Sequence, residues 1–302
     1  MAHTMVDLFA GIGGFHLAFH DLGAECVFAS EWDSEARKTY TRNFASISPE
    51  LFESGNFAGD ITQVDKASIP DFDILTGGFP CQPFSVAGQR KGFDDLRGTA
   101  FFDIAEIIRV KQPKAYFLEN VQNLRSHDEG RTLNKIRAVL TEDLGYSFQE
   151  FTVMASDHGL PQRRPRVFMI GFRDSALQVE RPKPRELAFS MSDVMGGEVD
   201  REIGFTLRVG GAGSGIHDRR NWNAYIVDGQ VAKLSPSQGK RMQGFPDNFE
   251  FPVSNKSAMK QLGNSVAVWA VRDFALEIIR TLDGADRQVM ASREDEGADA
   301  LG

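Results

Sequence analysis

Short apolar runs alternate with stretches of helical periodicity through the first half of the chain. Residues 5–9 form an apolar run of strand length, and the apolar positions of residues 15–22 recur with the spacing of a helix. A glycine-rich turn over residues 10–14 joins the two. Repetition of this unit predicts an α/β fold with a Rossmann-like, doubly wound sheet. The predicted strands are residues 5–9, 25–30, 73–76, 115–118, 147–156 and 166–172, and the predicted helices are residues 15–22, 101–111, 130–144 and 259–282.

The alternation stops at Pro182 and Pro184, which break the pattern. Residues 186–255 are rich in glycine and turn-forming residues and lack long helical periods. We therefore predict a catalytic domain over residues 1–185 and 256–282, and a second, smaller domain over residues 186–255. No internal repeat or coiled-coil register is present.

The composition is that of a soluble globular protein. Of 302 residues, 41% are hydrophobic and 25% are charged, which suffices for one large domain and a smaller one. The chain has no apolar run of transmembrane length and no basic-then-apolar leader, so we expect a cytoplasmic protein with no membrane partner. Two cysteines, Cys26 and Cys81, cannot form a disulfide framework, and six histidines show no ligand spacing, so no metal is expected.

Charge is unevenly distributed along the chain. The formal net charge is −8, but residues 283–302 hold six acidic and two basic residues, which is half of that excess. This segment is rich in Ala, Gly and Asp and is predicted to be a disordered acidic tail. Residues 205–245 hold six basic and two acidic residues, a local balance of +4. That stretch is either a solvated loop face or a phosphate-binding surface.

Residues 77–85, with the sequence GGFPCQPFS, place Cys81 directly after a predicted strand. Open α/β sheets present reactive groups beyond the carboxyl ends of their strands, which makes Cys81 a candidate nucleophile. The alternative is a small buried hydrophobic residue. The polar, glycine-rich residues 86–99 that follow are predicted to form a lid over it.

Carboxylates follow two other predicted strands near the glycine turn. Glu31 comes twenty residues after Gly11, where its two oxygens suit a ribose diol, and Trp32 could cover an adenine ring. Asp60 could accept the exocyclic amine of adenine or could simply cap a helix. The glycine spacing GxGG lacks the third glycine of a dinucleotide site, so the turn could instead only pack a helix on a strand.

Glu119 ends the predicted strand at residues 115–118, as Cys81 follows another. The two could therefore meet in one cleft as a thiol nucleophile and a carboxyl acid, although a charged residue capping a strand is the alternative. Three arginines in four positions, Arg163, Arg164 and Arg166, could contact phosphate or another anionic group.

Seven short motifs together resemble the motif series of the DNA (cytosine-5)-methyltransferases of bacterial restriction-modification systems. They occur in that family's order and cover nearly the whole chain except the middle of the small domain and the acidic tail. The motifs are residues 7–14 (DLFAGIGG), 31–33 (EWD), 59–62 (GDIT), 78–82 (GFPCQ), 119–121 (ENV), 162–166 (QRRPR) and 263–266 (GNSV).

The resemblance implies an S-adenosylmethionine-dependent methyltransferase sheet with a smaller target-recognition domain. It implies that Cys81 attacks carbon 6 of a flipped-out cytosine, because carbon 5 is too poor a nucleophile to take the methyl group unaided. Glu119 would hold ring nitrogen 3 and the exocyclic amine, and Arg166, with Arg164, would bind the carbonyl oxygen or orient the cysteine. The implied cofactor-binding residues are Phe9, Gly11, Gly13, Glu31, Trp32, Asp60, Ile61, Pro80, Asn264 and Ser265.

The same resemblance places target recognition at residues 204–233. Arginines there suit guanine edges and asparagines suit adenine edges, and the short segment suggests a site of about four to six base pairs. A monomer acting on double-stranded DNA is expected, paired in function with a restriction endonuclease but without a stable complex. A transfer-RNA cytosine methyltransferase of the same fold is the alternative, whereas a nicotinamide-dependent oxidoreductase or a non-catalytic protein would leave Cys81 and Glu119 unexplained. The expected DNA-binding residues are Ser85, Arg97, Arg208, Arg219, Arg220 and Asn221.

Overall fold

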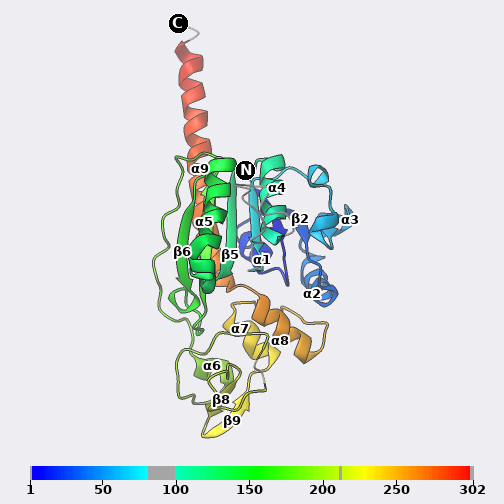
Figure 1. Cartoon of the computed structure of the whole chain (residues 1–302), viewed down its shortest axis with the longest axis vertical. Helices are drawn as coiled ribbons and strands as arrows, with labels where there is room; N and C mark the ends of the chain where they lie inside the picture. The colour runs from blue at the N-terminus through cyan, green and yellow to red at the C-terminus, as the bar shows by residue number, and fades with distance from the viewer. Residues whose placement is uncertain (1, 81–98, 211–212, 300–302) are drawn as a thin grey trace.

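A computed structural model of the chain describes residues 2–80, 99–210 and 213–299, with side chains described as far as residue 288 (Figure 1). Within the described residues, seven strands form one sheet in the order β3-β2-β1-β4-β5-β7-β6. Neighbours from β3 to β5 are parallel, whereas β7 runs antiparallel to both β5 and β6. This sheet confirms the predicted α/β, Rossmann-like fold. The strands are β1 (Thr4–Leu8), β2 (Glu25–Ser30), β3 (Phe57–Ala58), β4 (Ile74–Gly78), β5 (Ala115–Val121), β6 (Gln149–Met154) and β7 (Pro165–Phe172).

Helices cover both faces of the sheet because each central strand is apolar on both sides. On β5, Phe117 packs edge-on against Phe15 of α1 on one face, while Tyr116 and Leu118 belong to the core under α4 and α5 on the other. The helices of this unit are α1 (Gly14–His20), α2 (Ser34–Phe44), α3 (Pro49–Glu53), α4 (Ala100–Lys111), α5 (Arg131–Ala138) and α9 (Val268–Asp299). Short 3-10 turns are η1 (Ile61–Gln63), η2 (Lys66–Ser68), η4 (Gln122–Arg125), η5 (His127–Gly130) and η7 (Ala155–Asp157), and a π-helical turn, η6 (Val139–Asp143), extends α5.

A smaller unit lies beyond one edge of the sheet and contains α6, β8, β9 and α7 (Figure 1). Its hairpin turns at Asp228 and Gly229, both with left-handed backbone torsions, as the preferred two-residue hairpin turn requires. Ser235 caps α7 and Pro236 occupies its first turn. The bounds are α6 (Met191–Met195), β8 (Ala224–Val227), β9 (Gln230–Lys233), α7 (Pro236–Met242) and α8 (Asn255–Asn264).

The single helix predicted over residues 259–282 is wrong, because two helices occupy this part of the chain. Helix α8 ends at Asn264 and α9 begins at Val268. The break follows Gly263, Asn264 and Ser265, which are all weak helix formers. Helix α8 connects the small unit to α2, since the Gln261 amide oxygen accepts a buried hydrogen bond from Thr39 Oγ1 (2.9 Å) and Lys260 pairs with Asp33 (2.8 Å).

The predicted disordered tail also needs correction at its beginning. Helix α9 continues to Asp299 and projects away from the body of the molecule (Figure 1). Asp283 bonds to His3 Nε2 (3.0 Å) and Asp286 pairs with Lys114 (3.3 Å), so these two residues belong to the folded unit. Acidic residues placed against a histidine and a lysine can dock a helix that composition alone assigns to solvent. Among the described residues, no helix has both the length and the apolar character needed to cross a membrane.

Candidate active site

The carboxyl ends of β1, β2, β4 and β5 lie side by side at the edge of the sheet that faces the small unit (Figure 1). Strand register places Leu8 beside both Ser30 and Gly77, and Gly78 beside Glu119. The residues that follow these strand ends therefore meet at one edge, as the sequence predicted for an open α/β sheet.

Glu119 and Arg166 form an ion pair at this edge. Glu119 is 8% exposed, and Arg166 Nε lies 2.6 Å from its Oε1. The two side chains come from antiparallel neighbours, β5 and β7, on which Arg166 is the register partner of Val121. A Cβ atom at Gly78 would lie 3.4 Å from Glu119 Oε2, so glycine leaves the second carboxylate oxygen accessible from the β4 side. A charge-assisted pair of this kind holds a carboxylate in one orientation.

Asn120 holds the chain that leads from β4 toward Cys81. Its Nδ2 donates to the Phe79 carbonyl (2.8 Å), and its Oδ1 accepts the Val121 amide (2.9 Å). Asn120 is buried, so both bonds are protected from water. We did not predict this role, although Asn120 lies in the ENV motif. Cys81, Ser85 and Arg97, and the predicted lid at residues 86–99 except Thr99, lie outside the described residues.

The glycine turn and the end of β2 form a second part of the site. Gly11 donates its amide to Glu31 Oε2 (2.7 Å), and Asp33 donates to Glu31 Oε1 (2.8 Å). Burial is the main cause of the raised pKa of Glu31, and the hydrogen bonds from the two backbone amides partly offset this increase. Gly11 has φ +57° and no atom within 4 Å of its Cβ position, so open space adjoins the carboxylate.

Two aromatic residues lie close in the sequence to the residues of this part of the site, Phe9 before Gly11 and Trp32 after Glu31. Trp32 is 81% exposed, although a large apolar side chain normally avoids water. Phe9 has φ 55°, a left-handed torsion that is uncommon for a residue with a side chain. An exposed indole beside a buried carboxylate and an open glycine fits a planar, hydroxyl-bearing ligand such as an adenosyl group.

Gly13 has a packing role in the structure that the predicted ligand contact did not anticipate. A Cβ atom there would lie 2.2 Å from the Phe44 ring, and its φ is +83°. Gly13 therefore lets the start of α1 lie against α2, whereas the predicted packing alternative was a contact between a helix and a strand.

The remaining predicted cofactor residues are distributed around the same edge. Asp60 is exposed and caps η1 through the Thr62 amide (2.9 Å), which lowers its pKa. This bond matches the helix-cap alternative, and the carboxylate remains open to solvent. Ile61 and Ser265 are buried, whereas Pro80 and Asn264 are exposed.

Arg164 does not occupy the position that we predicted. It is 2% exposed, and its terminal nitrogens donate to the carbonyls of Leu207 (2.9 Å), Gly263 (3.0 Å) and Ser265. Burial, and then repulsion from Arg166, lower the pKa of Arg164. With these donors bound to backbone oxygens, Arg164 is not placed to bind a substrate carbonyl. The other predicted role, orienting Cys81, concerns a residue outside the described part of the chain.

The predicted DNA-binding residues separate into two groups. Arg208 and Arg219 are exposed, and Arg220 is exposed but pairs with Asp218 (2.7 Å). Asn221 is 5% exposed, and its amide is bonded to both backbone groups of Ala224 (2.9 and 3.0 Å), so the prediction that it reads bases is wrong. Its side chain forms a local turn that the sequence does not distinguish from an exposed asparagine.

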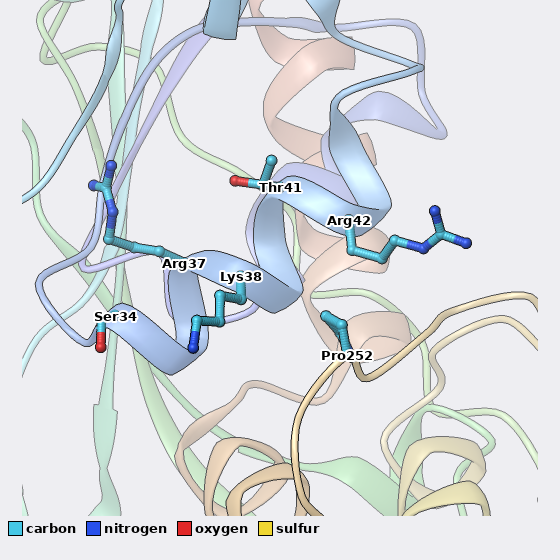
Figure 2. Close-up of a pocket in the computed structure, with 6 residues that line it drawn as sticks. All are labelled: Ser34, Arg37, Lys38, Thr41, Arg42 and Pro252. Atoms are coloured by element: carbon cyan, nitrogen blue, oxygen red, sulfur yellow. The ribbon is translucent and has the colours of Figure 1, made fainter.

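A hollow between α2 and Pro252 is not part of this site. Figure 2 shows three basic side chains around it, but each is already engaged. Arg42 pairs with Glu250 (2.7 Å), Lys38 pairs with Glu35 (2.5 Å), and Arg37 donates to backbone carbonyls at the end of β3. The hollow therefore offers no free positive charge to an anion. It is lined by Ser34, Arg37, Lys38, Thr41, Arg42 and Pro252.

Comparison with known proteins gives one consistent family. The family model described as C-5 cytosine-specific DNA methylase matches residues 3–196 and 196–280. The chain is 40% identical to the type II methyltransferase M.HpaII of Haemophilus parainfluenzae, over 92% of this chain and 90% of that one. It is 38% identical to the type II methyltransferase M.HhaI of Haemophilus parahaemolyticus, over 92% of this chain and 94% of that one.

Solved structures agree at the level of the fold. A DNMT2 mutant of Spodoptera frugiperda superposes with a TM-score of 0.70 at 19% identity, covering 92% of this chain and 100% of that one. A putative DNA modification methyltransferase encoded within an E. coli prophage gives 0.69 at 20% identity, covering 93% of this chain and 100% of that one.

Proposed function

Because the chain belongs to the C-5 cytosine-specific DNA methylase family, we propose that it transfers a methyl group from S-adenosylmethionine to carbon 5 of a cytosine within a short duplex DNA sequence. The observation that supports this most directly is the Glu119–Arg166 pair, which lies beside the strand that leads to Cys81. An anchored carboxylate beside the strand that leads to a candidate nucleophile suits addition of a thiol to a pyrimidine ring.

The edge formed by Glu31, Trp32 and Gly11 suits the adenosyl part of the cofactor. Glu31 uses one lone pair of each oxygen for an amide and retains others for ribose hydroxyls. Trp32 offers an exposed aromatic face to the adenine, and the open side of Gly11 admits the chain that links to the methionine end. When bound, the cofactor supplies an electrophilic methyl group.

The chain's own residues would act on the cytosine in a defined order. The Cys81 thiolate adds to carbon 6, which raises electron density at carbon 5 and at ring nitrogen 3. Glu119, held by Arg166, receives the exocyclic amine and holds a proton at nitrogen 3 as charge develops there. Further guanidinium donors of Arg166 are suited to the carbonyl oxygen. Once carbon 5 has taken the methyl group, loss of its proton to a base restores the 5,6 double bond, while the carbon 6–sulfur bond breaks and releases the Cys81 thiolate.

The target base would have to leave the duplex to reach this edge. A stacked and paired cytosine hides the face that the thiol attacks, so we propose that it is flipped out, at a cost of a few kcal/mol. Contacts from the small unit to phosphates and bases would offset that cost. We further propose that the chain acts as a monomer and is paired in function with a restriction endonuclease.

Sequencing after chemical conversion of unmodified cytosine tests this function. Plasmid DNA is taken from a host that lacks cytosine methylation and expresses the chain. Protected cytosines that share one short motif are the expected result and identify the recognition sequence. A folded protein that binds S-adenosylmethionine but protects no cytosine would refute a DNA substrate and favour RNA.

A further inference from the structure

Arg164 joins two chain segments that are far apart in the sequence. Its Nη1 donates to Leu207 in the small unit, and its Nη2 donates to Gly263 and Ser265 at the end of α8. Its Nε has no partner among the described residues. A buried guanidinium that donates to backbone carbonyls holds those carbonyls in place, because breaking any of these bonds leaves a buried charge with fewer partners.

Leu207 is held through both of its backbone groups. Its amide donates to Gln162 Oε1 (3.1 Å), while its carbonyl accepts from Arg164. Gln162 Nε2 also donates to the Met242 carbonyl and to Gln243 Oε1, which ties the same joint to the end of α7. The side chains of Gln162 and Arg164 thus supply the hydrogen bonds that a neighbouring strand would otherwise make to the backbone of Leu207.

Backbone contacts fix the rest of this segment. Gly204 donates to the Pro161 carbonyl (2.9 Å), and Arg163 donates to the Gly204 carbonyl (2.9 Å). At the other end, a Cβ atom on Gly263 would lie 2.7 Å from the Arg208 carbonyl carbon, which shows how closely the two backbones approach. Residues 204–209, here called the joint segment, are therefore clamped between residues 161–164 and the end of α8.

These contacts fix the position of Arg208, a candidate for DNA recognition, relative to the Glu119–Arg166 pair. Arg166, which holds Glu119, lies two residues after Arg164 in the sequence, and the exposed Arg208 follows Leu207 directly. On the basis of the proposed function, we propose that Arg164 is a positioning residue that sets the offset between the bases read by the small unit and the cytosine that reaches Glu119. Successive bases are about 3.4 Å apart along a strand, so displacement of the joint segment by even part of that distance blurs which cytosine is selected.

Arg164→Lys tests the proposal directly. Lysine retains the charge, but its single ammonium cannot span carbonyls of two separate segments. Arg163→Lys is the matched control, because it makes the same change at an exposed neighbour. The variants are expressed in a methylation-free host, and conversion sequencing gives the ratio of methylation at the preferred motif to that at sites differing by one base pair.

For Arg164→Lys we expect this ratio to fall about tenfold, the discrimination carried by roughly one base pair. Affinity for S-adenosylmethionine, measured on the purified protein, should remain within about twofold of the parent value, and Arg163→Lys should keep the parent ratio. If methylation by Arg164→Lys falls by the same factor at preferred and mismatched sites, so that the ratio is unchanged, Arg164 acts on the chemistry and the proposal is wrong.

Gly263→Ala provides a second variant if Arg164→Lys does not melt cooperatively. The added methyl group pushes on the Arg208 carbonyl without removing any hydrogen-bond donor or buried charge. The same fall in the ratio is expected, and an unchanged ratio in the folded variant overturns the proposal. A parent chain that methylates no cytosine would instead overturn the proposed function itself. That result differs from an unchanged ratio, so the two failures can be told apart.

Discussion

At the residue scale, an ion pair and several hydrogen bonds fix the orientation of the groups in the candidate site. Arg166 anchors Glu119, and Asn120 anchors the carbonyl of Phe79, two residues before Cys81 in the sequence. Glu31 is anchored by two amides before any ligand arrives. Such preorganisation lowers the reorganisation needed during the reaction.

Cys81→Ser should abolish covalent capture of DNA that contains 5-fluorocytosine, because a hydroxyl replaces the thiolate that adds to carbon 6. Affinity for S-adenosylmethionine should remain. Cys26→Ser is the matched control and should still form the adduct, since burial raises the pKa of the Cys26 thiol and makes it unreactive. Denaturing electrophoresis detects the adduct, and a trapped complex with Cys81→Ser would exclude Cys81 as the nucleophile.

Glu119→Gln should lower turnover about 10²- to 10⁴-fold, because an amide cannot hold the proton at nitrogen 3 and no longer pairs with Arg166. The affinity for S-adenosylmethionine should be unchanged, since Glu31 and Trp32 follow β2, whereas Glu119 lies on β5. Transfer of a labelled methyl group to duplex DNA measures turnover. Glu129→Gln, on an exposed turn, is the control, and equal turnover in the two variants would remove Glu119 from the mechanism.

At the element scale, helices α1 and α2 are joined by a buried histidine. His16 of α1 bonds to Tyr40 OH of α2 (2.7 Å) and to Ser48 Oγ (3.0 Å), and it stacks on Phe44. Burial lowers the pKa of His16 to about 3. The helices that flank the cofactor edge therefore depend on a neutral imidazole.

Acid should weaken this joint in a defined range. The unfolded chain binds a proton at His16 near pH 6.5, whereas the folded chain does so only near pH 3. Stability from this group is thus fully present above pH 6.5 and is lost progressively as the pH falls toward 3. Between pH 6.5 and 5, the free energy of unfolding of the parent should fall by roughly 1.6 kcal/mol more than that of His16→Gln. Urea unfolding measures both, and parallel slopes would contradict the prediction.

Helix α9 should contribute to stability only through its docked part. Truncation after Leu282 removes Asp283 and Asp286, which pair with His3 and Lys114, whereas truncation after Gln288 retains both acidic residues. We expect the shorter chain to melt about 2–4 °C lower, corresponding to roughly 1 kcal/mol. The chain ending at Gln288 should melt like the parent. Equal melting temperatures for the two truncations would show that these contacts add nothing.

At the scale of the whole molecule, charge is separated between the ends. The formal net charge is −8, yet residues 205–245 carry an excess of four positive charges and include exposed Arg208 and Arg219. The charged residues of segment 283–302 all lie on α9, which projects from the opposite side (Figure 1). A net negative protein can therefore present a positive surface to DNA.

This separation predicts a salt dependence of DNA binding. Arg219→Ala should reduce the slope of log affinity against log salt concentration by about one, because one phosphate contact is lost. Arg280→Ala on α9, whose side chain pairs with Glu277, makes the same charge change on the far element and should leave the slope unaltered. Fluorescence anisotropy over a salt series measures both slopes. Equal slopes in all three proteins would place DNA elsewhere.

The sequence by itself determined the fold class and the strand ends that carry the candidate residues. Apolar runs, the glycine turn and the acidic residues after the strands depend on local pattern, so the α/β sheet and the edge on which both Glu31 and Glu119 lie followed from them. The Asp-Gly pair at residues 228 and 229 is also a local signal for a hairpin, although the hairpin was not among our predictions.

Only the tertiary structure decided which polar side chains are buried. Arg164 resembles its exposed neighbour Arg163 in the sequence, but it is buried because its acceptors come from Leu207, Gly263 and Ser265, far along the chain. Likewise, Gly13 is needed because Phe44, thirty-one residues later, occupies the space of a side chain. Local pattern sets which element forms, whereas the partner of a buried polar group or a glycine depends on packing between segments that the sequence keeps apart.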